Sequence, residues 1–272
     1  MHNNITKYND ILKARKILSR NIIETPLLYD FYLSKKFDSN IFYKAENVQR
    51  TGSFKIRGAY NKIYNSITHH RPEGVLAWSS GNHAQGVAEA ANIFNLKATI
   101  VMPKDAPLIK IHGTKSRGAK IIFYDRKTEN REEIGKNLAK KYNLLIIPPY
   151  DDKYVIAGQG TIGLEIIKQI RKYDLVPDKI LVPTGGGGLI AGIATAIKKI
   201  YKATNLYSVE PNNFSDYSKS LECMKIIKNN MNNKSICDSL LAIEPGKLTF
   251  NINIKFVRKG LTVTDKQVLK AI

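Results

Sequence analysis

Short apolar runs alternate with longer amphipathic stretches along this chain of 272 residues. An apolar run of about four to eight residues is typical of a buried strand, whereas apolar residues at about every third or fourth position indicate a helix. Regular alternation of the two predicts an α/β fold with mostly parallel sheets covered by helices. The predicted strands lie at 41–45, 75–78, 98–102, 120–124, 144–148, 179–183 and 206–210. The predicted helices lie at 10–18, 54–64, 84–94, 131–142, 163–173 and 189–201.

Composition is that of a globular protein in a reducing compartment. The chain is 43% hydrophobic, and at about 100–200 residues per domain its length corresponds to one large or two modest domains. Cys223 and Cys237 show no metal-ligand spacing and do not suggest a disulfide framework. Residues 1–10 lack the apolar core of a signal peptide, so we expect a cytoplasmic protein.

The formal net charge of +20 raises the question of a nucleic-acid partner. Lysines are spread along the whole chain, however, and their local pairs are typical of solvated helix faces. We therefore expect no nucleic-acid partner.

Residues 180–197 carry no charge and have about the length of a membrane span, but Pro183 and four glycines interrupt them. A buried strand, a turn and a helix account for this stretch, so no membrane segment is expected.

The segment Thr51–Ala59 places one lysine, Lys55, after an aromatic residue and between two glycines. A lysine that bonds covalently to a carbonyl group must be desolvated and deprotonated, and glycines allow backbone to approach a ligand closely. The alternative is an exposed lysine at the start of a helix.

The segment Ser79–Gly86 follows an apolar run and precedes a helical pattern, so it predicts a strand, a turn and a helix start. Free N–H groups at such a helix start can bind a carboxylate. The alternative is ordinary capping of the helix by Ser80 or Asn82.

Four consecutive glycines, Gly185–Gly188, separate a predicted strand from an apolar helix. Ordering four glycines costs much conformational entropy, and a phosphate bound by their N–H groups would compensate for it. The alternative is a flexible linker.

Together these three segments resemble the threonine dehydratase and serine racemase group of pyridoxal-phosphate enzymes, of the tryptophan-synthase-β fold type. The likeness is greatest to the catabolic threonine dehydratases and runs from about Ile22 to the end of the chain. It includes 46–59, 79–88, 148–165 and 183–192.

The resemblance implies two open, mostly parallel sheets covered by helices. Residues 1–73 and 151–272 would form a larger domain that anchors the cofactor, and residues 74–150 a smaller inserted domain. The cofactor would lie in the cleft between the two domains.

The resemblance also implies roles for individual residues. Lys55 would hold pyridoxal 5′-phosphate covalently and act as the catalytic base. Phe54 would pack near the pyridine ring, Asn82 would bind the ring hydroxyl, and the backbone of Gly185, Gly186, Gly187, Gly188 and Leu189 would hold the phosphate. The substrate carboxylate would be bound by Ser79, Ser80, Gly81, Asn82 and His83, largely through backbone N–H groups.

The implied reaction is the dehydration and deamination of L-threonine or L-serine to a 2-oxo acid and ammonia, in threonine catabolism or isoleucine biosynthesis. The substrate would be a small hydroxy amino acid and the enzyme a homo-oligomer.

Catabolic dehydratases usually have alanine where this chain has Ser80, whereas serine racemases have a serine that acts as acid or base. A serine racemase-like activity is therefore an alternative, as is a purely structural Ser80.

Three further features bear on activity. Glu210 with Asp216 resembles the divalent-cation site of serine racemases and would suit Mg²⁺ or Ca²⁺. Ser239 stands where the family usually has a glycine against the cofactor ring. The chain ends at Ile272, before a serine of the family that meets the pyridine nitrogen. We therefore expect an incomplete larger domain, and a truncated, non-catalytic remnant is the competing hypothesis.

Overall fold

A computed structural model describes residues 5–68, 71–230 and 232–272. The chain forms two parallel sheets that are covered by helices, together with one small antiparallel pair of strands. The strands of the first sheet are ordered β5-β4-β3-β6 and are all parallel. They comprise β3 (Gly74–Trp78), β4 (Lys97–Pro103), β5 (Lys120–Tyr124) and β6 (Leu144–Ile146). The helices of this region are α3 (Lys55–Ile67), α4 (Asn82–Ile93), α5 (Leu108–Lys115) and α6 (Arg131–Lys141).

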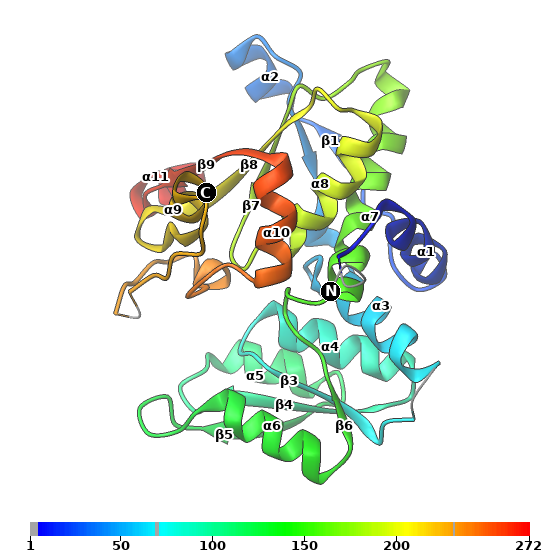
Figure 1. The fold of residues 1–272 in the computed structure, drawn as a ribbon, viewed down its shortest axis with the longest axis vertical. Coiled ribbons are helices and arrows are strands. Elements are labelled where there is room, and N and C mark those ends of the chain that lie inside the picture. The colour runs from blue at the N-terminus through cyan, green and yellow to red at the C-terminus, as the bar shows by residue number, and fades with distance from the viewer. Residues whose placement is uncertain (1–4, 69–70, 231) are drawn as a thin grey trace.

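The second sheet has the order β7-β8-β9 and is also parallel. In Figure 1 the sheet of β3 to β6 lies at the bottom, and the sheet of β7 to β9 lies above it with α8 and α10 alongside. The second sheet comprises β7 (Lys179–Pro183), β8 (Asn205–Pro211) and β9 (Val257–Val263). Its helices are α7 (Lys153–Ile170), α8 (Gly188–Ile200), α9 (Asp216–Cys223), α10 (Lys247–Phe256) and α11 (Asp265–Ala271).

The remaining elements lie near the N-terminus or are single turns. Strands β1 (Leu27–Tyr29) and β2 (Phe42–Lys44) pair antiparallel. The helices near them are α1 (Tyr8–Leu18) and α2 (Phe31–Phe37). The short 3₁₀ turns are η2 (Glu46–Val48), η3 (Arg171–Tyr173), η4 (Asn212–Phe214) and η5 (Asp238–Leu240).

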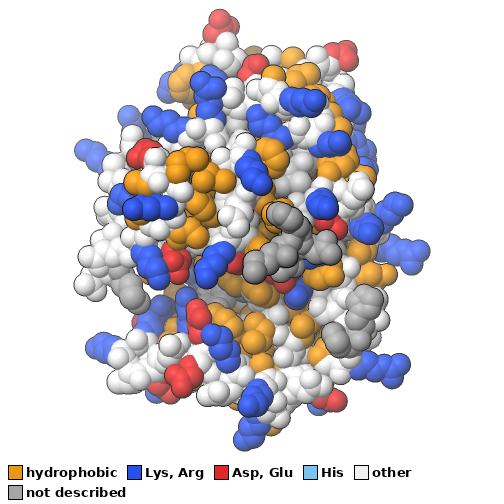
Figure 2. Space-filling view, viewed as in Figure 1, with side chains coloured by type: hydrophobic (Ala, Val, Ile, Leu, Met, Phe, Trp, Pro, Cys, Tyr) orange, Lys and Arg blue, Asp and Glu red, His pale blue; other side chains and the backbone are white. Residues whose placement is uncertain are grey.

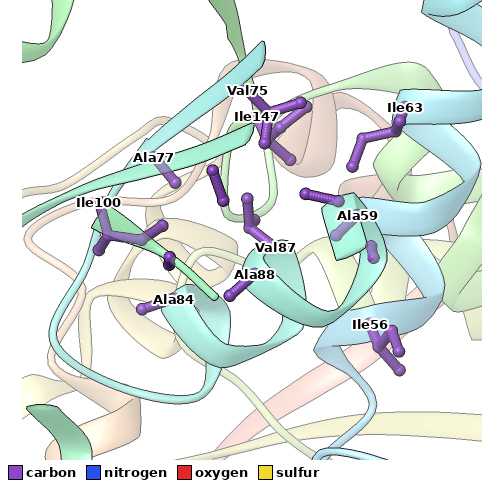
Figure 3. Packing of buried hydrophobic residues seen from close by; sticks show 14 of the residues in the cluster. Ile56, Ala59, Ile63, Val75, Ala77, Ala84, Val87, Ala88, Ile100 and Ile147 are labelled. Carbon is purple, nitrogen blue, oxygen red and sulfur yellow. The ribbon is translucent and has the colours of Figure 1, made fainter. Parts of the chain in front are cut away.

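The core of the first sheet extends into α3. Ile56, Ala59 and Ile63 of α3 are buried in one cluster with residues of β3, α4 and β4 (Figure 3). A separate cluster joins α7 and α8 to the second sheet. The helix that begins with Lys55 is therefore packed against the first sheet, although it precedes that sheet in the sequence.

The predicted strands β5 and β7 have the bounds expected from the sequence. The helix predicted at 163–173 was placed wrongly, because α7 begins at Lys153 and ends at Ile170. Most residues of α7 from Val155 onward are buried on every side, so this helix lacks the polar face on which a periodicity argument depends. Helices α5 and α10 and strand β9 were not predicted.

The uncharged stretch at 180–197 consists of β7, the glycine turn and part of α8, which is the predicted order of strand, turn and helix. The strand is not buried as predicted, because Leu181 is 58% exposed and only Val182 is buried. Over the described ranges, no helix combines the length and the apolar character needed to cross a membrane. Lysine and arginine side chains are scattered over the face in Figure 2 and do not gather in one patch.

Candidate active site

Lys55 is the first residue of α3 and lies in a partly buried position. Its Nζ donates a hydrogen bond of 3.0 Å to the carbonyl oxygen of Pro149 and lies 5.2 Å from the centre of the Phe54 ring. Desolvation by burial lowers the pKa of Lys55 from 10.5 to about 8. A much larger fraction of this amine is neutral near pH 7 than for an ordinary lysine, as a nucleophilic lysine requires.

Gly86 of α4 brings the Ser79–Gly86 segment against the start of α3. A Cβ atom at Gly86 would lie 2.9 Å from the backbone nitrogen of Ile56 and 3.0 Å from the carbonyl carbon of Lys55. Any larger residue would push α4 away from α3. The predicted carboxylate-binding segment and the predicted catalytic lysine are therefore neighbours.

The N-terminus of α4 has no side-chain cap. Gly81 is the N-cap residue, and Asn82 is already the first helical residue. The alternative that Ser80 or Asn82 caps this helix is therefore wrong. By contrast, Asn130 and Asp152 cap α6 and α7 with their side chains. The first N–H groups of α4 have no intrahelical partners, so they are available to an anion.

His83 lies in the first turn of α4 and is 5% exposed. Its Nε2 is 2.9 Å from the carbonyl oxygen of Ile147, which can only accept, so Nε2 carries the proton. The buried Nδ1 has no hydrogen-bond partner among the described residues. Burial, together with the nearby charge of Lys55, lowers the pKa of His83 to about 3. His83 is therefore neutral at ordinary pH, and its unpaired Nδ1 is an acceptor beside Lys55.

The four glycines form an ordered, buried turn, so the alternative of a flexible linker is wrong. Gly187 has φ +89°, a left-handed conformation that favours glycine, and it is the N-cap of α8 without a side-chain cap. A Cβ at Gly186 would lie 2.3 Å from the Tyr150 ring, and one at Gly187 would lie 2.4 Å from the hydroxyl of Tyr217. Backbone N–H groups of such a turn can bind a phosphate.

Residues 149–152 connect the lysine with the glycine turn, and the sequence analysis did not single them out as site residues. Pro149 accepts the hydrogen bond from Lys55, and the next residue, Tyr150, packs against Gly186 and Gly188. The sequence signal was present, since Pro-Pro-Tyr-Asp-Asp begins at Pro148, the last residue of the predicted strand 144–148. Its role depends on contacts that the sequence does not show.

These observations fit pyridoxal 5′-phosphate. A lysine with a lowered pKa suits its aldehyde, and the uncapped glycine turn at α8 suits its phosphate. The Ser239 position also lies beside this turn, because a Cβ at Gly185 would be 3.8 Å from the Ser239 carbonyl oxygen. Lys55, the α4 start and the glycine turn are thus brought together from three separate parts of the sequence.

Glu210, in β8, and Asp216, the first residue of α9, are buried. Glu210 accepts hydrogen bonds from the N–H groups of Tyr217 (2.9 Å) and Ser218 (2.7 Å), so it caps α9. Burial raises the pKa of Glu210 to about 8 and that of Asp216 to about 7. Across the described ranges, no group of three or more His, Cys, Asp or Glu side chains could hold a metal ion. The divalent-cation site stays a prediction.

Arg57 forms two buried ion pairs beneath Lys55. It is 1% exposed and makes paired hydrogen bonds to the carboxylates of Glu46 and Glu165. Burial disfavours the charged guanidinium, but the bonds and charges of the two glutamates outweigh burial and raise the pKa of Arg57. These ion pairs fix the first turn of α3, which carries Lys55, to η2 and α7.

Comparison with known proteins identifies one matching family and several related enzymes. The model of a family described as pyridoxal-phosphate dependent enzyme matches residues 18–272. The L-threo-3-hydroxyaspartate ammonia-lyase of Saccharomyces cerevisiae is 39% identical over 98% of this chain and 80% of its own length. The catabolic L-threonine dehydratase TdcB of Staphylococcus aureus is 39% identical over 97% of this chain and 75% of its own length.

Among solved structures, maize serine racemase matches with a TM-score of 0.93 and 33% identity, over 98% of this chain and 79% of that chain. The arrangement of two helix-covered parallel sheets is therefore shared with this structure. The three names state different substrates or reactions, namely hydroxyaspartate, threonine and the racemisation of serine.

Proposed function

This chain belongs to the family of pyridoxal-phosphate-dependent enzymes, and on that premise we propose that it deaminates L-threonine or L-serine to a 2-oxo acid and ammonia. The observation that carries the proposal is Lys55, a partly buried lysine with a lowered pKa that lies against α4 and bonds to Pro149, next to the residue that packs on the glycine turn. The similarity to a threonine dehydratase supports the choice of substrate.

Different residues would bind the cofactor and the substrate. Lys55 would hold the cofactor through its aldehyde, Phe54 would lie beside the ring, and Asn82 would bind the ring hydroxyl. The N–H groups of the glycine turn, Gly185 to Leu189, hold the phosphate. The first N–H groups of α4, in the segment Ser79 to His83, hold the substrate carboxylate. The site lies between the proposed smaller domain, 74–150, and the rest of the chain.

When bound, the cofactor supplies an electron sink for the bond between Cα and its hydrogen. Lys55 would be the base that takes the Cα proton on Nζ, and its amine would regain its bond to the cofactor as the product leaves. The β-hydroxyl then leaves with a proton as water. The resulting enamine takes up one water and releases ammonia, which leaves the 2-oxo acid. No net water is consumed, and no oxidant or reductant is required.

Racemisation of serine is the second candidate, and the position of Ser80 favours it. Ser80 is partly buried, directly precedes the N-cap of α4 and does not cap that helix. Its hydroxyl is free of the structural role that would otherwise explain a serine here. A hydroxyl on the opposite side of the substrate from Lys55 would return the proton to the other face of Cα.

The test begins with cofactor binding and then measures turnover. Borohydride reduction of the protein with pyridoxal 5′-phosphate should leave the cofactor on Lys55, as read by peptide mass spectrometry. Release of 2-oxo acid from L-threonine, L-serine and L-threo-3-hydroxyaspartate should then identify the substrate. Lys55→Ala should abolish all release, and Lys62→Ala, on the same helix, is the matched control.

Two results would contradict the proposal. Trapping of the cofactor on other lysines would remove Lys55 from the site. Cofactor trapping without release of 2-oxo acid from any hydroxy amino acid would remove the deaminase activity. Conversion of L-serine to D-serine that is lost in Ser80→Ala, while release of 2-oxo acid continues, would establish the second candidate.

A further inference from the structure

Helix α10 lies against the glycine turn and holds two of its carbonyl groups. The Thr249 hydroxyl is 2.7 Å from the carbonyl oxygen of Gly186, closer than the 3.0 Å to its alternative acceptor in Gly246. Four residues later on the same helix face, Asn253 Nδ2 donates to the carbonyl oxygen of Gly187 at 3.1 Å. Thr249 and Asn253 are both fully buried, so these bonds are protected from water.

These two side-chain bonds add to backbone bonds that the same carbonyls accept, from the Gly246 N–H to Gly186 (3.2 Å) and from the Ala191 N–H to Gly187 (3.0 Å). Together the four bonds orient the N–H groups of the turn. In a planar trans peptide, the carbonyl of one residue and the N–H of the next point in opposite directions. With the Gly186 and Gly187 carbonyls directed at α10, the N–H groups of Gly187 and Gly188 are directed away from α10. Glycines restrict their own backbone little, so the bonds from Thr249 and Asn253 add to those of Gly246 and Ala191 in holding the turn in one orientation.

The start of α10 is itself held by Asp151. The Asp151 carboxylate accepts hydrogen bonds from the N–H groups of Lys247 (3.1 Å), Leu248 (2.8 Å) and Thr249 (3.2 Å). Asp151 follows Tyr150, whose ring packs against the glycine turn. The position of α10 relative to the turn is therefore fixed at its N-terminal end, next to the carbonyl that Lys55 contacts.

We propose that Thr249 and Asn253 are positioning residues that direct the N–H groups of Gly187 and Gly188 toward the phosphate of the cofactor. This inference rests on the proposed function, which places that phosphate at the glycine turn. Neither side chain contacts the cofactor, and both act through the glycine carbonyls. Their removal lets the turn adopt other orientations in which fewer N–H groups face the anion, so the effect falls on the phosphate and not on the aldehyde.

The test compares two aldehydes, pyridoxal 5′-phosphate and pyridoxal, which lacks the phosphate. Binding of each is measured by fluorescence titration and by borohydride trapping on Lys55, without any measurement of turnover. Since a net hydrogen bond contributes about 1 kcal/mol, Thr249→Val should weaken binding of the phosphorylated aldehyde about fivefold. Pyridoxal should bind the variant and the parent protein equally.

Control variants separate positioning from loss of fold. Thr249→Ser keeps the hydroxyl and should restore the preference for the phosphorylated aldehyde. Thr195→Val removes a threonine hydroxyl that bonds only to the Ala191 carbonyl within α8, at 2.8 Å, and should leave both affinities unchanged. Asn253→Leu tests the second carbonyl, and adding it to Thr249→Val should reduce the preference further.

The results distinguish a failure of the proposed function from a failure of the inference about Thr249 and Asn253. If neither aldehyde is trapped on Lys55 of the parent protein, the proposed function is wrong and this inference falls with it. If both are trapped but the preference for the phosphorylated aldehyde is the same in Thr249→Val, Asn253→Leu and the parent, the inference alone is overturned. An equal loss of affinity for both aldehydes would also overturn it, because that loss reports general damage to the site.

Discussion

Replacing Arg57 by methionine tests whether the buried ion pairs beneath Lys55 stabilise the fold. Arg57 is 1% exposed, and the side chains of Glu46 and Glu165 are 13% and 10% exposed. Methionine matches the length of the arginine stem and removes the charge. The change therefore leaves two carboxylates in a place from which water is largely excluded.

The substitution Arg57→Met leaves the two glutamates with different remaining partners. Glu165 keeps a direct ion pair with Lys44 at 2.6 Å, whereas Glu46 keeps a hydrogen bond from the Thr25 hydroxyl at 2.5 Å and the more distant charge of Lys44. Removing one partner of a buried ion pair costs about 3–5 kcal/mol. Because Lys44 compensates for one of the two carboxylates, we expect the free energy of unfolding to fall by about 3 kcal/mol, the lower end of that range. That is a large part of the net stability of a typical protein, about 5–15 kcal/mol.

Urea denaturation followed by circular dichroism measures this loss, provided that the slope of free energy against urea is unchanged. Arg126 provides the matched control, since it pairs with Asp105 at 2.8 Å but both side chains are at least half exposed (50% and 68%). Arg126→Met should cost only about 0–1 kcal/mol. Adding Glu46→Gln to Arg57→Met should recover about 1 kcal/mol, since it removes the uncompensated charge.

Two results would refute the reasoning. The first is a cost of Arg57→Met no greater than that of Arg126→Met. The second is a double variant, with Glu46→Gln, that is less stable than Arg57→Met alone. Either would mean that Arg57 contributes by packing and not by compensating buried carboxylates.

Three further predictions concern the site itself. The rate of cofactor trapping on Lys55 should rise with pH with a midpoint near pH 8, because burial lowers the pKa of this amine and the neutral form reacts; a midpoint near the ordinary value of 10.5 would contradict this. Gly187→Ala should lower the free energy of unfolding by about 1–3 kcal/mol, measured in urea, because its Cβ would lie 2.4 Å from the Tyr217 hydroxyl. Gly118→Ala, with φ +78° but open space around its Cβ, should lower the free energy of unfolding by less. An equal loss in the two variants would exclude the contact with Tyr217 as the cause. If Glu210 and Asp216 bind Mg²⁺, the ion should raise the melting temperature of the parent protein but not that of Asp216→Asn, whereas no rise in the parent would argue against the site.

The main functional segments could be recognised from the sequence because each has a local signature. A strand followed by small residues and a helix start predicted the turn at Ser79–Gly86, and the structure has α4 beginning at Asn82. The four glycines predicted a turn that no other residues could form, and Gly187 is left-handed with φ +89°. Strand bounds such as Lys179–Pro183 followed from short apolar runs, although only Val182 of this strand is buried. In each case the signal lies within about ten residues of sequence.

The orientation of these segments depends on partners far away in the chain, which only the tertiary structure shows. The carbonyl that Lys55 contacts lies 94 residues away, and the asparagine that holds Gly187 lies 66 residues away. The lowered pKa of Lys55 is a result of burial, which a sequence motif does not encode. Helix α7 was misplaced for the same reason, since a helix buried on all sides lacks an amphipathic pattern. Local sequence thus determined which conformations each segment can adopt, and long-range packing and desolvation decided how the segments face one another and which charges they carry.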